Sequence, residues 1–226
     1  MNEQCQEDSY PLPRIDDILV KQGQKHIHSV LDLKDAFHQI PLRKEDRYIT
    51  GTVTPRGLFQ WKVVPMGWKN GVQHCQRNLE VSLRAVDHIA SGYVDDILIG
   101  SDKEGIDGTS VEQLLLKHDR EIRQVLEELR KFKMVASRKK AQFFQRSVNF
   151  CGWALKDGNR EPLQGRILAL EKWELPKTIT SLRGFLRFAN YYSGYIGNSA
   201  EIVAPMQEKL KVDKGQGKKG STVRIK

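Results

Sequence analysis

The chain reads Tyr93-Val94-Asp95-Asp96-Ile97-Leu98-Ile99-Gly100-Ser101 after an apolar segment that begins at Ile89. This pattern predicts two short strands that meet near the two aspartates. Adjacent carboxylates repel each other unless a cation neutralises them. A tight turn between strands this apolar usually contains Asn-Gly or Asp-Gly, whereas this one has no glycine at its tip. The stretch therefore indicates either a solvated acidic turn or a metal site.

The composition limits the class of protein. The 226 residues are 39% hydrophobic and 29% charged, which is typical of a soluble globular chain. No apolar run approaches the roughly 20 residues of a membrane span, and the polar, acidic N-terminus does not look like a secretory signal. Cys5, Cys75 and Cys151 lie far apart and form no CxxC pair, which favours a reducing compartment without disulfides or structural zinc. We therefore expect a protein that is neither secreted nor bound to a membrane.

The net charge of +9 is concentrated in two segments. Residues 129–146 contain seven basic residues, among them Lys139 and Lys140, together with three phenylalanines and no acidic residue. This combination fits a groove for a nucleic-acid backbone, and it fits equally well a solvated helix end followed by an amphipathic strand. Residues 211–226 are also basic but carry few apolar side chains, so we expect a disordered tail there.

The spacing of apolar residues predicts an α+β fold. The expected elements are a strand at 27–33, a helix at about 68–86, the hairpin at 89–101, a helix at 111–132, two strands within 142–153, and helices at about 163–173 and 179–194. Up to residue 153 this order corresponds to a βαββαβ sheet with two helices on one face. The last two helices would form a separate segment, divided by Pro176.

Asp32 stands at the end of the first predicted strand. In a βαββαβ sheet this strand lies beside the hairpin, so Asp32 would face Asp95 and Asp96 at one edge. Mg²⁺ prefers hard oxygen ligands and is often shared with substrate phosphates. Two such ions about 4 Å apart stabilise both the attacking and the leaving oxygen of a phosphoryl transfer. The three carboxylates therefore predict a two-metal site.

Five blocks of sequence carry a family resemblance through their order and spacing. They are Asp8-Ser9-Tyr10-Pro11-Leu12-Pro13-Arg14-Ile15-Asp16-Asp17, Leu31-Asp32-Leu33-Lys34-Asp35-Ala36-Phe37-His38-Gln39-Ile40, Pro65-Met66-Gly67-Trp68-Lys69-Asn70, Tyr93-Val94-Asp95-Asp96-Ile97-Leu98, and Leu182-Arg183-Gly184-Phe185 with Ala189-Asn190-Tyr191-Tyr192. Over residues 8–210 the chain resembles reverse transcriptases, most closely those of the gypsy class of long-terminal-repeat retrotransposons. The first and third blocks argue against a palm-type nucleotidyl cyclase, which has the same sheet.

The resemblance implies a right-hand polymerase fold and RNA-directed DNA polymerase activity. Residues 1–154 would form the palm and part of the fingers, 155–210 a helical segment like the thumb or connection, and 211–226 the basic tail. Family members have fingers strands, with a basic residue for the triphosphate, upstream of the block at Tyr10, and a ribonuclease H domain downstream. We therefore expect part of a longer polyprotein that polymerises weakly or not at all in isolation. It would act in the cytoplasm, a virus-like particle or the nucleus.

By resemblance, Asp32, Asp95 and Asp96 are the three palm carboxylates. Asp32 and Asp95 would hold two Mg²⁺ ions, with Mn²⁺ as the alternative metal, and Asp96 would shape the site. The implied reaction is attack of a primer 3′-hydroxyl on the α-phosphate of a deoxynucleoside triphosphate, directed by an RNA or DNA template. The alternative is an inactive retroelement remnant that still binds nucleic acid.

The resemblance also implies contacts to the nucleotide and the nucleic acid. Phe37 matches an aromatic ring beneath the sugar that leaves no room for a 2′-hydroxyl, and an ordinary core aromatic is the alternative. Asp35 is equally consistent with a turn cap, and Met66, which cannot donate a hydrogen bond, is expected to pack. The nucleotide-binding set is Leu33, Asp35, Ala36, Phe37, Met66 and Tyr93. The primer and template set is Gly67, Trp68, Lys139, Lys140 and the block Phe150, Cys151, Gly152 and Trp153, which is nearly as consistent with a structural turn.

Overall fold

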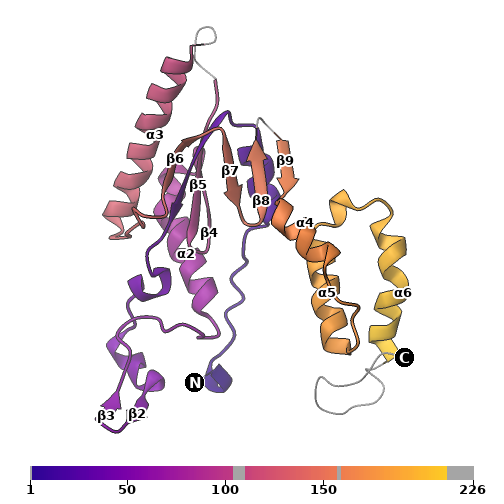
Figure 1. Cartoon of the computed structure of the whole chain (residues 1–226). Coiled ribbons are helices and arrows are strands. Elements are labelled where there is room, and N and C mark those ends of the chain that lie inside the picture. The colour runs from indigo at the N-terminus through magenta and orange to yellow at the C-terminus, as the bar shows by residue number, and fades with distance from the viewer. Residues whose placement is uncertain (1, 104–109, 157–158, 213–226) are drawn as a thin grey trace. The chain divides into compact units, whose positions relative to one another are not determined.

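Two compact units make up the chain, Met1–Glu161 and Pro162–Lys226 (Figure 1). The computed structural model describes residues 2–103, 110–156 and 159–212. The tail predicted at 211–226 lies outside the described residues, apart from the last two positions of a helix. Within the described part of the chain, no helix is both long and apolar enough to cross a lipid bilayer.

A four-stranded antiparallel sheet forms the centre of the first unit, in the order β4-β5-β1-β6. The strands are β1 (Ile27–Asp32), β4 (Ala90–Tyr93), β5 (Asp96–Ser101) and β6 (Gln142–Gln145). The two central strands, β1 and β5, are buried along almost their whole length. With helices α2 and α3 inserted, the chain order is β1, α2, β4, β5, α3, β6, which is the predicted βαββαβ order.

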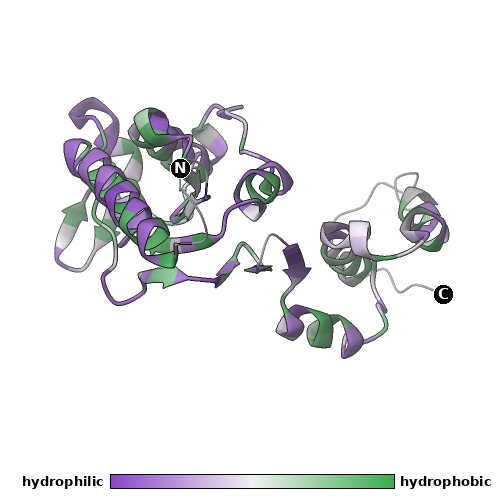
Figure 2. Ribbon diagram, turned by 90° about the horizontal axis from the view of Figure 1, so that it is seen from above, coloured by the Kyte–Doolittle hydropathy of each residue, from purple (hydrophilic) through white to green (hydrophobic). Residues whose placement is uncertain are grey.

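Helices α2 (Gly71–Leu83) and α3 (Val111–Lys131) pack on one face of this sheet and share its hydrophobic core. In α2 the buried residues Cys75 and Leu79 are four positions apart, as one apolar stripe requires. The helix approaches β4 closely because the strand has Gly92, where a Cβ would lie 2.5 Å from Leu79 Cδ2. Both hydrophilic and hydrophobic stripes are visible along the helices in Figure 2.

The remaining elements of the first unit surround the sheet. The sequence predicted two strands within 142–153, but the structure has β6, β7 and the first residue of β8 there, because the chain bends at Arg146 and leaves the main sheet. β7, β8 and β9 form a second sheet, and β2 pairs with β3 in a small hairpin. The bounds are η1 (Asn2–Gln4), α1 (Ile15–Gly23), η2 (Ala36–Gln39), η3 (Lys44–Thr50), β2 (Thr52–Thr54), β3 (Gly57–Phe59), η4 (Arg84–Val86), β7 (Ser147–Phe150), β8 (Trp153–Lys156) and β9 (Asn159–Pro162).

The second unit is helical. Its elements are α4 (Gln164–Glu171), α5 (Ile179–Tyr191), η5 (Ser193–Tyr195) and α6 (Ser199–Val212). A capping box starts α5, in which Thr178 Oγ1 accepts the Ser181 N–H and Ser181 Oγ accepts the Thr178 N–H, each at 3.1 Å. α4 and α5 agree with the two helices that the sequence predicts on either side of Pro176.

Candidate active site

The turn between β4 and β5 consists of Val94 and Asp95, and Tyr93 pairs with Asp96 across it. Val94 has a φ of 58°, in the left-handed region. This conformation costs a residue with a Cβ about 1–2 kcal/mol, because the Cβ crowds the following carbonyl oxygen, and it is especially rare for β-branched residues. Such strain persists only where surrounding contacts hold it, and it is concentrated at functional sites.

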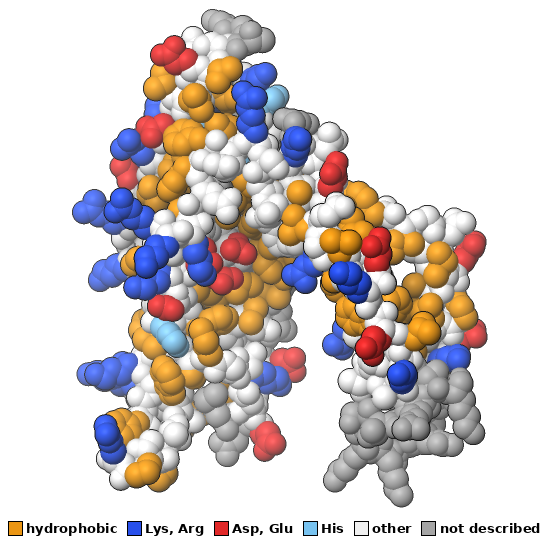
Figure 3. Space-filling model, viewed as in Figure 1, with side chains coloured by type: hydrophobic (Ala, Val, Ile, Leu, Met, Phe, Trp, Pro, Cys, Tyr) orange, Lys and Arg blue, Asp and Glu red, His pale blue; other side chains and the backbone are white. Residues whose placement is uncertain are grey.

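Asp32 lies at the end of β1, directly opposite Asp96 in the β1–β5 ladder. Just beyond this pair, the Leu33 N–H donates to the carbonyl oxygen of Asp95 at 2.7 Å. The antiparallel register therefore brings Asp32, Asp95 and Asp96 from distant parts of the sequence to one edge of the sheet. On the face shown in Figure 3, acidic side chains gather in the middle of the first unit beside a group of Lys and Arg.

The negative charge at this edge is only partly compensated. Burial, followed by the charges of Asp95 and Asp32, raises the pKa of Asp96 to about 6. Lys140 Nζ donates to Asp32 Oδ2 at 2.9 Å, although 66% of the lysine side chain is exposed. This bond raises the pKa of Lys140, and the lysine charge acts against the increase at Asp96. Lys139 next to it is exposed.

The donor set fits a hard divalent cation, since carboxylate oxygens suit Mg²⁺ and Mn²⁺. Among the residues that the structure describes, however, no group of three or more His, Cys, Asp or Glu side chains is already arranged to hold a metal ion. One oxygen of Asp32 is bonded to Lys140 instead. Charge and ligand type therefore match a cation. In this side-chain arrangement the Lys140 ammonium group supplies part of the positive charge that a metal ion would bring.

The residues predicted to bind the nucleotide differ in exposure. Leu33 and Ala36 are only 2% and 6% exposed, so their backbone rather than their side chains can face a ligand. Asp35 is exposed, has a φ of 49° and immediately precedes η2. Phe37 is half-buried and packs against the core beside Gly71, so its ring is available on one side only.

A turn before α2 contains three further predicted residues. Met66 is 67% exposed, so the packing role predicted for it is wrong. The turn is closed by a 3.4 Å hydrogen bond from the Trp68 N–H to the Pro65 carbonyl, and it leaves the Met66 side chain at the surface. Gly67 has a φ of 81°, which favours glycine. The indole N–H of Trp68 donates to Cys5 Sγ at 3.1 Å, so Trp68 is tied to the N-terminal segment.

The predicted block from Phe150 to Trp153 is the β7–β8 turn. Cys151 and Gly152 both have positive φ, at 47° and 87°, as a two-residue type I′ turn requires. Phe150 and Trp153 pair across this turn and are only 2% and 3% exposed. Their rings are therefore part of the core, and Cys151 and Gly152 are the residues that this hairpin can present to a ligand.

Electrostatic interactions place this turn near the carboxylates. Burial raises the pKa of Cys151 to about 12, and the charges of Asp96 and Asp95 act in the same direction. The pKa of the half-buried Tyr93 is likewise raised, first by burial and then by Cys151. The β4–β5 and β7–β8 turns thus lie around one acidic centre.

Gln76 is a site residue that the sequence analysis missed. It is 0% exposed on α2, and its side chain accepts the Val94 N–H. The available signal was a glutamine directly after Cys75, next to the apolar stripe of the predicted helix. That spacing does not reveal the contact, because the partner is a backbone group of the β4–β5 turn.

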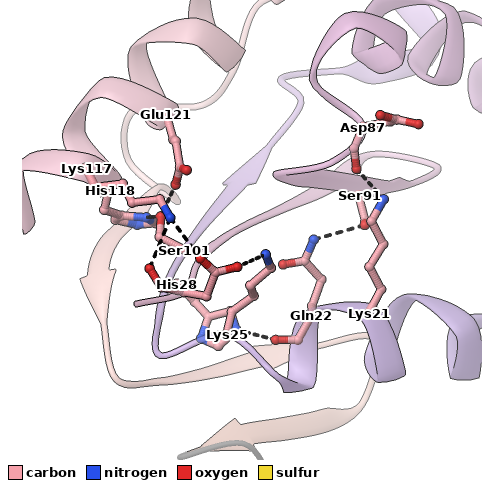
Figure 4. Close-up of polar contacts among 11 residues, drawn as sticks. Lys21, Gln22, Lys25, His28, Asp87, Ser91, Ser101, Lys117, His118 and Glu121 are labelled. Atoms are coloured by element: carbon pink, nitrogen blue, oxygen red, sulfur yellow. Dashed lines mark hydrogen bonds and ion pairs between the residues drawn. The ribbon is translucent and has the colours of Figure 1, made fainter. Parts of the chain in front are cut away.

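A second polar cluster lies at the opposite end of β5 (Figure 4). Ser101 Oγ lies 2.5 Å from His118 Nδ1 and donates to Glu121, so His118 Nδ1 must carry the proton. The other ring nitrogen, Nε2, then accepts from Ser29 Oγ at 2.8 Å. Burial lowers the pKa of His118 to about 4. With the histidine neutral and fully buried, this cluster is structural.

Comparison with known families identifies the class of protein. Residues 1–155, more than half of the chain, match the family model described as Reverse transcriptase (RNA-dependent DNA polymerase). The chain therefore belongs to the reverse transcriptase family.

Curated relatives are polyproteins of viral and transposon origin. The Enzymatic polyprotein of Cauliflower mosaic virus (strain Strasbourg) is 34% identical over 215 residues, which cover 93% of this chain and 30% of the polyprotein. The Transposon Tf2-3 polyprotein of Schizosaccharomyces pombe is 30% identical over 214 residues, which cover 94% of this chain and 15% of the polyprotein. The chain thus spans less than a third of the length of these relatives.

Solved structures of the foamy viral protease-reverse transcriptase have the same fold. The complex with double-stranded DNA gives a TM-score of 0.76 at 20% identity and covers 93% of this chain and 35% of that chain. The complex with an RNA/DNA hybrid gives a TM-score of 0.75 at 20% identity, and the match covers 93% of this chain and 27% of that chain. The α+β, right-hand polymerase fold predicted from the sequence is confirmed by this similarity.

Proposed function

We propose that this chain carries the palm chemistry of an RNA-directed DNA polymerase. It would transfer a nucleotide from a deoxynucleoside triphosphate to a primer 3′-hydroxyl on an RNA or DNA template. The observation that carries this proposal is the gathering of Asp32, Asp95 and Asp96 at one sheet edge, in a chain that belongs to the reverse transcriptase family.

The carboxylates would be the ligands of two divalent cations, Mg²⁺ or Mn²⁺. Asp32 and Asp95 would bind them, and Asp96 would support the site from its half-buried position opposite Asp32. When bound, such ions lower the pKa of the primer hydroxyl and neutralise the triphosphate and the leaving pyrophosphate. Lys140, now bonded to Asp32, would then be released toward the phosphates of the primer or template.

The nucleotide would lie beside η2. The backbone amides of Asp35 and Ala36 would face the triphosphate, because the Ala36 side chain is buried and backbone N–H groups bind phosphate well. Phe37, which packs against the core, would offer a 2′-hydroxyl neither space nor a hydrogen-bond partner. The backbone of Leu33 and the side chains of Met66 and Tyr93 would complete this subsite.

Primer and template would follow the β7–β8 turn and the turn before α2. Cys151 and Gly152, beside the acidic centre, suit the primer end, whereas Gly67 and Trp68 suit the template. Phe150 and Trp153 would support the first turn from the core. Lys139 and Lys140 would contact phosphates. Within this arrangement residues 1–154 would serve as palm and partial fingers and residues 155–210 as a helical thumb or connection.

The relatives support a retroelement origin. Homologues occur in Tf2 transposon and caulimovirus polyproteins, and we assign the chain more narrowly to the gypsy class on its sequence blocks. It would act as part of a polyprotein that includes ribonuclease H, within the cytoplasm, a virus-like particle or the nucleus. Its three cysteines lie far apart in the sequence and form no CxxC pair, which favours a reducing compartment.

Primer extension on an RNA template with deoxynucleotides and Mg²⁺ tests the proposal. The chain offers a matched control, because Asp16-Asp17 is a second Asp-Asp pair and Asp17 is exposed on α1. We expect the weak extension by the isolated chain to be lost in Asp95→Asn and retained in Asp17→Asn. Extension that persists in Asp95→Asn would contradict the proposal.

The alternative function, a nucleic-acid-binding remnant, makes a different prediction in the same experiment. Neither the unmodified chain nor Asp95→Asn would extend the primer, and both would bind template–primer with equal affinity. That affinity would fall as salt rises, because lysine contacts to phosphate release counterions.

A further inference from the structure

Side chains of α2 hold both backbone groups of Val94. Gln76 Oε1 accepts the Val94 N–H at 2.7 Å, and Cys75 Sγ donates to the Val94 carbonyl at 3.1 Å. Both side chains belong to residues that are 0% exposed. A valine with a φ of 58° needs such external bonds, because its conformation is unfavourable on its own.

Glu80 determines which way the Gln76 amide faces. Gln76 Nε2 donates to Glu80 Oε1 at 2.8 Å and to the Gly92 carbonyl at 3.1 Å. A carboxylate and a carbonyl can only accept, so the amide nitrogen must face them and the amide oxygen must face Val94. The Tyr10 hydroxyl donates to the second oxygen of Glu80 and holds it in place.

The other half of the turn is held from β1. The Asp95 carbonyl accepts the Leu33 N–H at 2.7 Å, immediately after Asp32. Val94 is thus fixed from the helix side and Asp95 from the strand side. The direction in which the Asp95 side chain leaves the turn depends on both attachments.

We infer that Gln76 is a positioning residue for Asp95, and that Glu80 keeps the Gln76 amide in the one orientation that can hold the Val94 peptide. The inference rests on the proposed polymerase function of the Asp95 site. It adds to that function a pair of side chains, Gln76 and Glu80, that would support the site without touching the nucleotide or the primer.

The variant Gln76→Glu tests this pair by removing a donor while keeping the shape of the side chain. A carboxyl group at position 76 has at most one proton, so it cannot donate to both the Glu80 carboxylate and the Gly92 carbonyl as the amide does. The double variant Gln76→Glu/Glu80→Gln places the donor on residue 80, so that one oxygen at position 76 can be held by the amide of residue 80 while the other accepts the Val94 N–H. It has the same net charge and composition as the unmodified chain.

Two measurements follow the variants: hydrogen exchange of the Val94 amide by NMR, and kcat and KM in primer extension. We expect Gln76→Glu to exchange the Val94 amide about tenfold faster or more and to lower kcat by about 10-fold to 100-fold, as loss of a supporting contact does at metal sites. The KM for template–primer should stay within about twofold, because no nucleic-acid contact is lost. The double variant should recover part of both effects, because the bond between residues 76 and 80 is restored and the donor to the Gly92 carbonyl is not.

Gln22→Glu is the matched control. Gln22 is also a glutamine with 0% exposure, and it donates to Ser91 Oγ on the same strand β4 at 3.1 Å, away from the turn. This variant should destabilise the protein without selective exchange at Val94. If Gln76→Glu does not fold, Gln76→Met replaces it, since it removes all three of these side-chain hydrogen bonds without adding a charge.

Unchanged Val94 exchange in Gln76→Glu would overturn the inference. So would an increase shared equally by all core amides, or a double variant that recovers nothing. If the unmodified chain does not extend primers measurably, as the sequence analysis allows for the isolated chain, Val94 exchange and its recovery still decide whether Gln76 holds the turn.

Discussion

The two ends of the β1–β5 ladder differ in how their charged side chains are paired. At one end Asp32 faces Asp96 beside Asp95, and the exposed Lys140 bonds to one of these three carboxylates. Burial and like charges raise the pKa of Asp96 to about 6. This end of the sheet therefore holds negative charge that the fold disfavours.

At the other end Asp102 is paired with two lysines. Asp102 accepts from Lys25 at 2.5 Å and from Lys117 at 2.8 Å, and the pKa of Asp102 is held well below its usual range by the hydrogen bonds and charges of these lysines, which outweigh its burial. His118 is neutral and lies beside Ser101 (Figure 4). Its other ring nitrogen accepts from Ser29.

The difference separates structural from functional polar residues. Groups that are paired within the chain stabilise the fold, whereas the partly compensated carboxylates repel one another, and a bound cation would relieve that repulsion. The same substitution should therefore change stability in opposite directions at the two ends of β5.

The largest effect is expected for Asp102→Asn. It leaves Lys25 and Lys117, whose side chains are only 16% and 24% exposed, without their carboxylate. Allowing for screening by solvent, we expect the free energy of unfolding at pH 7 to fall by about 2 kcal/mol. Urea denaturation measures this change. Asp17→Asn, on an exposed residue, should stay within about 0.5 kcal/mol, and an equal result for the two variants would remove the distinction between paired and unpaired acids.

The second effect is a difference in pH dependence. His118 has a folded pKa of about 4, below its ordinary value of 6.5. Its contribution to the free energy of unfolding is therefore fully present above pH 6.5 and is lost as the pH falls through 4. Asp96 has a folded pKa of about 6, above its ordinary value of 3.8. Its contribution to the free energy of unfolding is therefore fully present below pH 3.8 and is lost as the pH rises through 6. Between these values the two ends of β5 oppose each other.

Asp96→Asn should therefore expose the histidine contribution. In this variant we expect the free energy of unfolding to fall by about 1–2 kcal/mol between pH 7 and pH 5, and by less in the unmodified chain, where Asp96 offsets the loss. Urea midpoints across this range measure both curves. Parallel curves would show that Asp96 is not the opposing group.

The smallest effect is the stability of Asp96→Asn itself at pH 8. The substitution removes a half-buried charge that faces Asp95 and Asp32. After allowance for its partial exposure, we expect a gain of about 1 kcal/mol in the free energy of unfolding. Destabilisation by thermal or urea melting would mean that the carboxylate is compensated in the fold after all.

Elements with a strong periodic pattern could be predicted from the sequence. The stripe through Leu114, Ile122, Val125 and Leu129 defines α3, and the order of strands places Asp32 opposite the acidic turn. Periodicity carries no information about the surface turn that exposes Met66 or about the bond from Gln76 to the Val94 backbone. These features depend on local turn geometry and on contacts between segments far apart in the chain.

Titration with Mn²⁺, followed by electron paramagnetic resonance, tests most directly the claim that the uncompensated end of β5 is a cation site. We predict that the unmodified chain binds Mn²⁺ in competition with Mg²⁺, that Asp17→Asn binds equally well, and that Asp95→Asn binds at least about tenfold more weakly, because a carboxylate ligand is lost. Equal Mn²⁺ affinity of Asp95→Asn and the unmodified chain would contradict the account.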